Sequence, residues 1–326
     1  MMTTSLFIRA IGVMNIPFTI MIKPWDAGFT NNHAKNLSST DCETVVSNIR
    51  DFLGEVDMKF STFKSESLVS RARLGNWAPL LEDSEFMEIY ARSALAKRIT
   101  HGSFDAFTTG LYDPTGVAKG WAIEQAFQRF LKPLITNTTT AQNPHNHEDT
   151  SEVYSKNPSE RTRSLVEAVA LNGGGDMQFG ISQASQFEWN IGIENPAEPN
   201  TILAQYHLQN GAVATSGFSK RGHHIVTTEA FNKEALTQVT VVTGSITDAD
   251  MWATACLAAG ESAAVGMAQS NGFGMLALRP DSRLIEIQQI HQTWDITPGT
   301  AQSLPPGNPS PCKSSHARTS VTTTQE

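Results

Sequence analysis

The chain has 326 residues, 40% of them hydrophobic, and is long enough to bury one large core or two small ones. It carries 24 basic and 32 acidic residues, a formal charge of −8, and no dense run of Lys and Arg, which argues against nucleic acid as a partner. The three cysteines, Cys42, Cys256 and Cys312, are odd in number and far apart; they indicate neither a disulfide framework nor a CxxC metal site and fit a reducing compartment.

The N-terminal segment is apolar without being a targeting signal. It contains Arg9, Asn15 and Pro17 and has no small-residue cleavage site, so we expect no signal peptide. Nowhere does the chain contain a run of about 18 apolar residues, the length that spans a bilayer. We therefore expect no stable membrane insertion.

The first half of the chain predicts one strand and two helices. Residues 18–22 (FTIMI) are apolar and partly β-branched, which favours a strand that opens the core sheet. Apolar residues recur at helical spacing over residues 42–56, with Asp41 as N-cap. A second helix is predicted over residues 84–99, with Gly102 as its stop.

Two segments predict irregular structure and set the domain boundary. Residues 137–163 are polar, carry two prolines and lack an apolar period, which indicates an exposed insertion. Residues 296–326 are rich in Pro, Ser and Thr and predict a disordered tail. Residues 1–295 are then a single large domain.

The second half predicts strands and one long helix. Alternation in VEAVALNGGG (166–175) and FEWNIGI (187–193) indicates short strands with a glycine turn between them. QVTVVTGS (238–245) predicts a strand that leads directly into a helix in DADMWATACLAAG (248–260). Strands outnumber helices and do not alternate strictly with them, so the pattern favours an α+β fold over a doubly wound sheet.

The stretch TGVAKG (115–120) has two glycines around Lys119. Glycines permit positive φ and a close approach of backbone N–H groups to a ligand, and a lysine offers a point charge for phosphate. The spacing matches neither GxxxxGK[ST] nor GxGxxG. The alternative interpretation is a strand-to-helix turn with a solvated lysine.

Three further motifs have both a structural and a functional interpretation. NGGGDM (172–177) is a hairpin turn or a second place of close approach to a ligand, with Asp176 accepting from a ribose hydroxyl or an amine. Asp250 and Thr254 are four residues apart near a helix start and face the same way as a ligand pair, while Thr247 with Asp250 has the form of a capping pair. A magnesium site there needs the negative charge of a bound diphosphate, because the helix dipole opposes a cation.

The adjacent histidines in RGHHIV, His223 and His224, precede a β-branched pair, so their side chains are expected to face opposite ways. One of them could face a cleft. The alternative is a pair of ordinary surface or core histidines.

The order of these motifs resembles the ApbE-type flavin transferase family, which moves FMN from FAD onto a protein hydroxyl. The resemblance extends over residues 11–278 and rests on blocks in the order of the family. They are FSTFKSESLVSRAR, HGSFDAF, YDPTGVAKGWAIE, LNGGGDM, ATSGFSKRGHHI and VTVVTGSITDADMWATA.

The resemblance implies a fold and an activity. The fold is a T-fold-related α+β domain of two intertwined halves, with mixed or antiparallel sheets packed against helices. The activity is protein flavinylation: magnesium-dependent transfer of FMN from FAD to a Thr or Ser hydroxyl, with AMP as the leaving group. The implied acceptor is a membrane redox subunit or soluble flavoprotein with a short Gly-Ala-Thr/Ser type motif.

The resemblance also implies site residues. The implied magnesium ligands are Asp250, Thr254 and the main-chain carbonyl of Ala118. His224 is the candidate catalytic residue, which assists the acceptor hydroxyl. The implied FAD-binding residues are Phe63, Asp113, Gly116, Val117, Ala118, Lys119, Gly174, Gly175, Asp176, Ser216 and Gly217. Phe63 stands where the family usually has a tyrosine that lies against the flavin nucleotide, and it keeps the stacking face without the hydroxyl.

The sequence departs from the family pattern in three places. AIGVMNIPF replaces the early Met-Gly-Thr, Thr115 replaces the first glycine of a Gly-Gly pair, and HHIVTTEA lacks the Asp-Pro that usually follows His-Ile. These departures keep two alternatives open, an FAD pyrophosphatase that yields FMN and AMP, and a non-catalytic flavin-binding protein. The lipoprotein leader and lipobox cysteine of the family are not present, so we expect a cytoplasmic location.

Overall fold

The computed structural model describes residues 5–26, 37–136, 164–198, 200–217 and 235–288, together with the backbone of 319–321. The predicted insertion at residues 137–163 lies outside these ranges, as do His223 and His224. What the sequence predicts for them stays a prediction.

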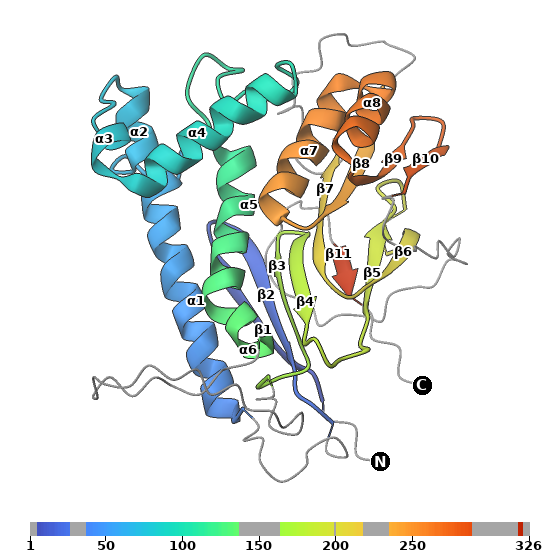
Figure 1. Cartoon of the computed structure of the whole chain (residues 1–326). Helices are drawn as coiled ribbons and strands as arrows, with labels where there is room; N and C mark the ends of the chain where they lie inside the picture. Colours follow the sequence, from blue (N-terminus) through green and yellow to red (C-terminus); the bar gives the residue numbers. More distant parts are fainter. Residues whose placement is uncertain are drawn as a thin grey trace, which may run out of the picture.

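An eight-stranded antiparallel sheet forms the middle layer of the protein (Figure 1). Its strand order is β1-β2-β3-β4-β7-β8-β9-β10, and a second, three-stranded sheet has the order β11-β5-β6. The strands are β1 (Phe7–Val13), β2 (Ile16–Lys23), β3 (Ala168–Gly173), β4 (Asp176–Ile181), β5 (Trp189–Glu194), β6 (Ile202–Leu208), β7 (Gly211–Gly217), β8 (Gln238–Thr243), β9 (Gly274–Leu278), β10 (Leu284–Ile287) and β11 (Thr319–Val321). Because every described strand pair is antiparallel, the α+β prediction is confirmed and a doubly wound sheet is excluded for this part of the chain.

The helices lie on one side of the large sheet, and the small sheet lies on the other (Figure 1). They are α1 (Ser39–Phe60), α2 (Leu68–Arg73), α3 (Pro79–Glu82), α4 (Ser84–Ile99), α5 (Thr115–Ala126), the π-helical turn η2 (Phe127–Leu131), α6 (Lys132–Ile135), α7 (Ile246–Ala259) and α8 (Glu261–Asn271). None of the described helices is both long and apolar enough to cross a bilayer.

Strand β3 shows how the three layers share their apolar residues. Val169 and Leu171 point into the core between sheet and helices, and Ala168 and Ala170 point into the core between the two sheets. Both faces of the central strands are therefore covered. This explains why β3 and β4 are buried along nearly their whole length.

The predicted N-terminal elements are present, with one correction. Strand β2 contains the predicted 18–22, and α4 coincides with the predicted 84–99; Gly102 follows it with φ +85° and donates its N–H to the Lys97 carbonyl at 2.8 Å. The N-cap of α1 is Ser38 rather than Asp41. The Asp41 carboxylate instead accepts from the Ser38 N–H at 2.9 Å, and the Ser38 hydroxyl accepts from the Asp41 N–H at 3.1 Å, which is a reciprocal capping box.

Part of the predicted tail has backbone structure. Residues 319–321 form β11, which pairs with β5 in the small sheet. The rest of residues 296–326 lies outside the described residues, so its disorder stays a prediction.

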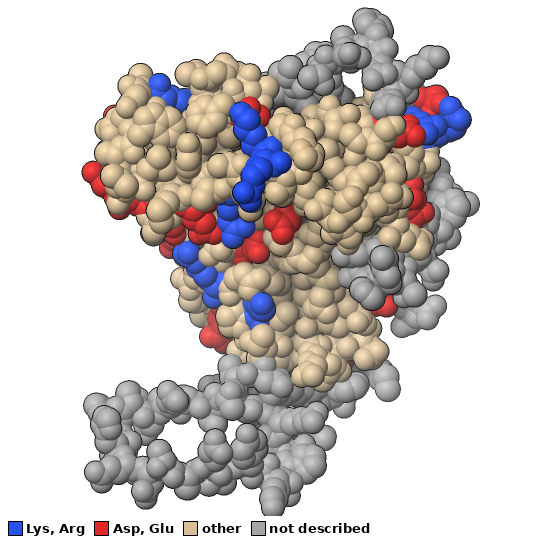
Figure 2. Space-filling view, turned by 45° about the horizontal axis from the view of Figure 1, so that its top comes forward, with Lys and Arg blue, Asp and Glu red and all other residues tan. Residues whose placement is uncertain are grey.

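Charges of both signs mix on the surface. On the face shown in Figure 2, Lys and Arg form a narrow band that Asp and Glu border, while most of the surface is neither. Ion pairs such as Arg92–Glu88, at 2.8 Å, show the same mixing. Exposed pairs of this kind add little stability, typically below about 1 kcal/mol.

Candidate functional site

The centre of the candidate site is a buried cluster of three charged side chains. Lys119 of α5 hydrogen bonds to Asp176 of β4, and its Nζ lies 3.3 Å from Oδ1 of Asp250 of α7. All three residues are buried, with 2–6% of their surface exposed. One ammonium faces two carboxylates, so the cluster carries a net negative charge when all three are ionised, and such a cluster favours a further cation.

Asp176 is placed by a two-residue glycine turn. Gly173 pairs with Asp176, and Gly174 (φ +65°) and Gly175 (φ +108°) close the β3–β4 hairpin between them. Their N–H groups donate within the protein, to the Pro17 carbonyl at 2.9 Å and to Asn172 Oδ1 at 3.1 Å. The hairpin interpretation of NGGGDM is therefore confirmed.

The carboxylate of Asp176 is also held from the neighbouring strand. Its Oδ1 accepts from the backbone N–H of Thr215 in β7 at 2.9 Å. Since Oδ2 accepts from Lys119, both oxygens have partners inside the protein. Asp176 thus accepts from an amine, as its sequence context allowed, but the amine is that of Lys119.

The structure corrects the interpretation of TGVAKG as a glycine-rich turn. These residues form the first turns of helix α5, and neither Gly116 nor Gly120 has a positive φ. Both glycines serve close packing instead. A Cβ on Gly116 would lie 2.8 Å from the Phe104 ring, and one on Gly120 would lie 2.9 Å from the carbonyl oxygen of Ile246. Glycine at 120 lets α5 approach α7 closely enough for Lys119 to reach Asp250.

The capping interpretation of Thr247 and Asp250 is wrong. The N-cap of α7 is Ser245, whose hydroxyl accepts from the Asp248 N–H at 3.3 Å. Asp250 lies beyond the cap, inside the helix, and is buried against α5. Its partner in the ligand-pair interpretation, Thr254, lies one turn further along, with its Oγ1 3.2 Å from the hydroxyl of Ser216 in β7.

Two residues that the sequence analysis missed hold the first turn of α7. Glu124 of α5 accepts from the hydroxyls of Ser245, at 2.7 Å, and Thr247. Gln178 of β4 accepts from the Ile246 N–H at 2.8 Å. Its amide nitrogen donates to two further carbonyls, of Gly211 at 3.0 Å and Gly244 at 3.1 Å. The only sequence signal for Glu124 is a carboxylate inside an apolar helix, and Gln178 has none.

A second group of candidate residues lies at the N-terminus of α5. Asp113 Oδ1 accepts from the N–H of Thr115 at 3.0 Å and from its hydroxyl at 2.5 Å, which forms an Asx turn around Pro114, the N-cap of α5. The Thr115 departure from the family pattern thus gains a hydrogen bond. Arg73 lies 3.4 Å from the other Asp113 oxygen, and Phe63 has 89% of its surface exposed.

The buried charged cluster and the group at the N-terminus of α5 are about one helical turn apart. Lys119 follows Thr115 by four residues, which is about 6 Å along the axis of α5. The side chains of Val117 and Ala118 between them are buried in the core, so any ligand contact there would use main-chain atoms. Gly217 ends β7 opposite Gln238.

The donor set suits magnesium only with a ligand bound. Within the described ranges, no three His, Cys, Asp or Glu side chains gather as a metal site. Asp250, Thr254 and the Ala118 carbonyl offer only oxygen atoms, the type that Mg²⁺ prefers, and protein magnesium sites commonly take one or two carboxylates and complete the shell with phosphates and water. The oxygen chemistry of these residues therefore fits magnesium, which they would hold together with a phosphate ligand.

Comparisons with known proteins agree with the resemblance seen in the sequence. The ApbE family model matches residues 160–277. The blocks at residues 60–73, 101–107 and 112–124 lie before that range. No curated protein matches the sequence.

Solved structures extend the likeness to most of the chain. The ApbE protein of Thermotoga maritima has a TM-score of 0.61 at 16% identity, over 86% of this chain and 97% of its own. The flavinyl transferase ApbE of Pseudomonas stutzeri, in its apo form, has 0.59 at 13% identity, over 89% and 97%. The flavin transferase ApbE of Vibrio cholerae has 0.59 at 15% identity, over 87% and 96%. The resemblance to the ApbE family and the α+β fold of antiparallel sheets and helices are thereby confirmed.

Proposed function

We propose that the protein is an FAD:protein FMN transferase, which moves FMN from FAD to a Thr or Ser hydroxyl of an acceptor flavoprotein with magnesium as cofactor. The observation that carries the proposal is the buried cluster of Lys119, Asp176 and Asp250, with the Thr254 hydroxyl one turn along α7. A diphosphate needs a cation beside it, and its magnesium ion needs carboxylate and hydroxyl oxygen as ligands. Lys119, Asp250 and Thr254 supply these three groups.

Lys119 and Asp250 would have different roles at the phosphates. Asp250, Thr254 and the Ala118 carbonyl would hold magnesium, which when bound offsets the charge of the diphosphate and polarises it for attack. Lys119 would offset further phosphate charge, and Asp176 would keep the Lys119 ammonium in place. Because phosphoryl transfer depends mainly on alignment and charge stabilisation, fixed groups of this kind are the contribution that the protein has to make.

The flavin nucleotide would extend from this cluster toward the N-terminus of α5. Phe63 would stack on it, and Asp113, Gly116 and Val117 would line it at the start of α5. Ser216 and Gly217 would lie along β7, and Gly174 and Gly175 at the β3–β4 turn.

The transfer step balances without a further reactant. The acceptor hydroxyl oxygen forms a bond to the FMN phosphorus, the bond from that phosphorus to the bridging oxygen breaks, and AMP leaves. The hydroxyl proton would pass to His224, which lies outside the described residues. If water took the place of the hydroxyl, the same step would hydrolyse FAD to FMN and AMP.

Intact mass spectrometry of an acceptor tests the proposal. The protein is incubated with FAD, magnesium and a flavoprotein subunit that carries a Gly-Ala-Thr/Ser type motif. A magnesium-dependent gain of one FMN residue supports transfer; free FMN and AMP would indicate the hydrolase, and intact FAD retained on the protein would indicate the binder. Asp250→Asn should abolish the gain, whereas Asp248→Asn, at an exposed position two residues earlier, should keep it.

A further inference from the structure

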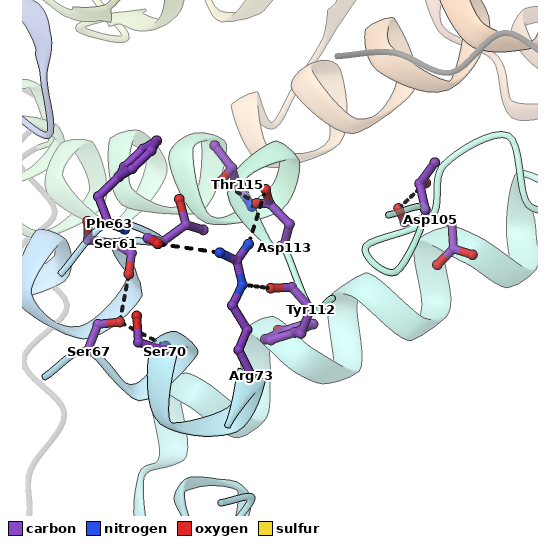
Figure 3. A network of polar contacts seen from close by, with 11 residues as sticks. Ser61, Phe63, Ser67, Ser70, Arg73, Asp105, Tyr112, Asp113 and Thr115 are labelled. Atoms are coloured by element: carbon purple, nitrogen blue, oxygen red, sulfur yellow. Dashed lines mark hydrogen bonds and ion pairs between the residues drawn. The ribbon is translucent and has the colours of Figure 1, made fainter. Parts of the chain in front are cut away.

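Phe63 has an exposed side chain on a backbone that hydrogen bonds hold in place. Phe63 is 89% exposed, and an aromatic ring in water offers a large apolar area that a ligand can cover. It lies in the loop between α1 and α2, and its ring points away from the surrounding hydrogen bonds (Figure 3). An exposed ring on a fixed backbone is the arrangement of a binding contact that is ordered before the ligand arrives.

The loop is held by one face of α2 and its N-cap. Ser67, Ser70 and Arg73 are spaced three residues apart, and each donates from its side chain to a loop carbonyl. Figure 3 shows the bonds of Ser67 and Arg73. Ser67 donates to Ser61 at 2.6 Å, Ser70 to Lys64 at 2.7 Å, and Arg73 Nη1 to Thr62 at 3.3 Å. The carbonyls on both sides of Phe63 are thus engaged.

Arg73 also connects this loop to the start of α5. Its Nε donates to the Tyr112 carbonyl at 2.6 Å, and its Nη2 lies 3.4 Å from Asp113 Oδ2. Tyr112 is a firm anchor, because it is 1% exposed and packs among aromatic rings that include Phe107, 5.3 Å away between ring centres. A single guanidinium therefore joins the Phe63 loop to the helix that carries Lys119.

We propose that Arg73 is a positioning residue that fixes the Phe63 loop against the N-terminus of α5, so that the ring is in place for the flavin before FAD binds. This inference rests on the proposed function, in which Phe63 stacks on the flavin nucleotide. The planar fork of arginine reaches the Thr62 carbonyl, the Tyr112 carbonyl and Asp113 at once, and the compact ammonium of lysine cannot. Arg73→Lys should therefore fail to replace it.

Hydrogen exchange tests whether Arg73 holds the loop at residues 61–67, and it needs no ligand. In Arg73→Met, backbone amides of residues 61–67 should exchange faster than in the wild type, while those of α4 stay protected. Arg71→Met is the matched control, because Arg71 is on the same helix and its side chain, within the described part of the chain, has only a 3.9 Å ion pair with Glu82. If exchange over residues 61–67 does not change in Arg73→Met, the inference is overturned. If that variant does not fold, Arg73→Lys takes its place with the same expectation, because lysine cannot reach the three acceptors at once.

A double-mutant cycle shows whether Arg73 acts through Phe63. Arg73→Met should weaken FAD binding roughly five- to tenfold, the loss expected when an ordered contact becomes mobile, and Phe63→Ala should abolish that sensitivity. An equal loss in both backgrounds would mean that Arg73 contacts FAD directly, which overturns the inference. If the wild type binds no FAD, the proposed function fails, while hydrogen exchange still decides whether Arg73 holds the Phe63 loop.

Discussion

The Glu124 carboxylate, five residues after Lys119 on α5, accepts a hydrogen bond from the Ser245 hydroxyl, five residues before Asp250 on α7, at 2.7 Å. This contact joins α5, which carries Lys119, to α7, which carries Asp250. It therefore connects two helices that bear opposite charges of the cluster. The helix N-terminus, with its partial positive charge, thus meets a carboxylate from another element.

Removing this carboxylate should weaken the junction. Glu124→Ala should lower the free energy of unfolding by about 2–3 kcal/mol, because it leaves the Ser245 and Thr247 hydroxyls without their acceptor. Glu124→Gln keeps one acceptor oxygen and should lose less. Urea unfolding measures both, and equal losses would contradict a hydrogen-bonding role.

Gln178→Glu should be more harmful than its small size change suggests. The substitution replaces an amide nitrogen that donates to the carbonyls of Gly211 and Gly244 with an oxygen that repels them. We expect a loss of about 2–4 kcal/mol at neutral pH, because buried polar groups are left unsatisfied. Gln178→Met removes the amide without adding repulsion and serves as the comparison. A loss in Gln178→Glu no greater than that in Gln178→Met would contradict the prediction.

Gly120→Ala should push α5 away from α7. Its Cβ would lie 2.9 Å from the Ile246 oxygen and the Thr247 Cα, both of them backbone atoms that cannot move aside cheaply. We expect about 1–3 kcal/mol of destabilisation and weaker FAD binding, as Lys119 moves from Asp250. Gly54→Ala in α1 meets nothing within 4 Å and should gain up to about 1 kcal/mol through helix propensity. Thermal unfolding of both variants is the measurement.

Lys119→Met should leave two buried carboxylates without their shared cation. We expect about 3–5 kcal/mol of destabilisation, the usual result of removing one partner from a buried ion pair. Adding Asp176→Asn should restore part of it, since one of the two charges is then gone. Unfolding at neutral pH compares the variants, and a double variant as unstable as the single one would argue against charge as the cause.

The two described cysteines should be unreactive in the native state. Burial raises the pKa of Cys42, and it raises that of Cys256 to about 12, so little thiolate forms at neutral pH. In a Cys312→Ser variant, a maleimide reagent should label neither residue until the protein is unfolded. Mass spectrometry counts the labels, and rapid native labelling of Cys256 would contradict the burial.

Local patterns were enough for several elements. The apolar β-branched run at residues 18–22 and the helical period at 84–99 predicted β2 and α4, because one element's own residues determine which face is apolar. The N-cap of α1 was misplaced by three residues, since Ser38 and Asp41 both have capping side chains and only the backbone geometry separates them.

The site was predicted less completely. Lys119, Asp176 and Asp250 were each named from separate motifs, but no spacing in the sequence indicated that they form one ionic cluster. Glu124, Gln178 and Arg73 act on atoms far away in the chain, most of them backbone carbonyls and N–H groups that carry no residue type of their own. Such contacts leave no sequence pattern.

The sequence by itself determined β2, α4, the strand at residues 238–243 that leads into α7, and the blocks that resemble the ApbE family. Only the tertiary structure decided that TGVAKG is helical, that its glycines serve packing, and that Lys119 lies between two carboxylates. The physical reason is that glycine permits both a left-handed turn and a close helix contact, and its neighbours in the chain do not distinguish the two. Burial against α7 decides the outcome, because the carbonyl of Ile246 occupies the space that any Cβ at 120 would need.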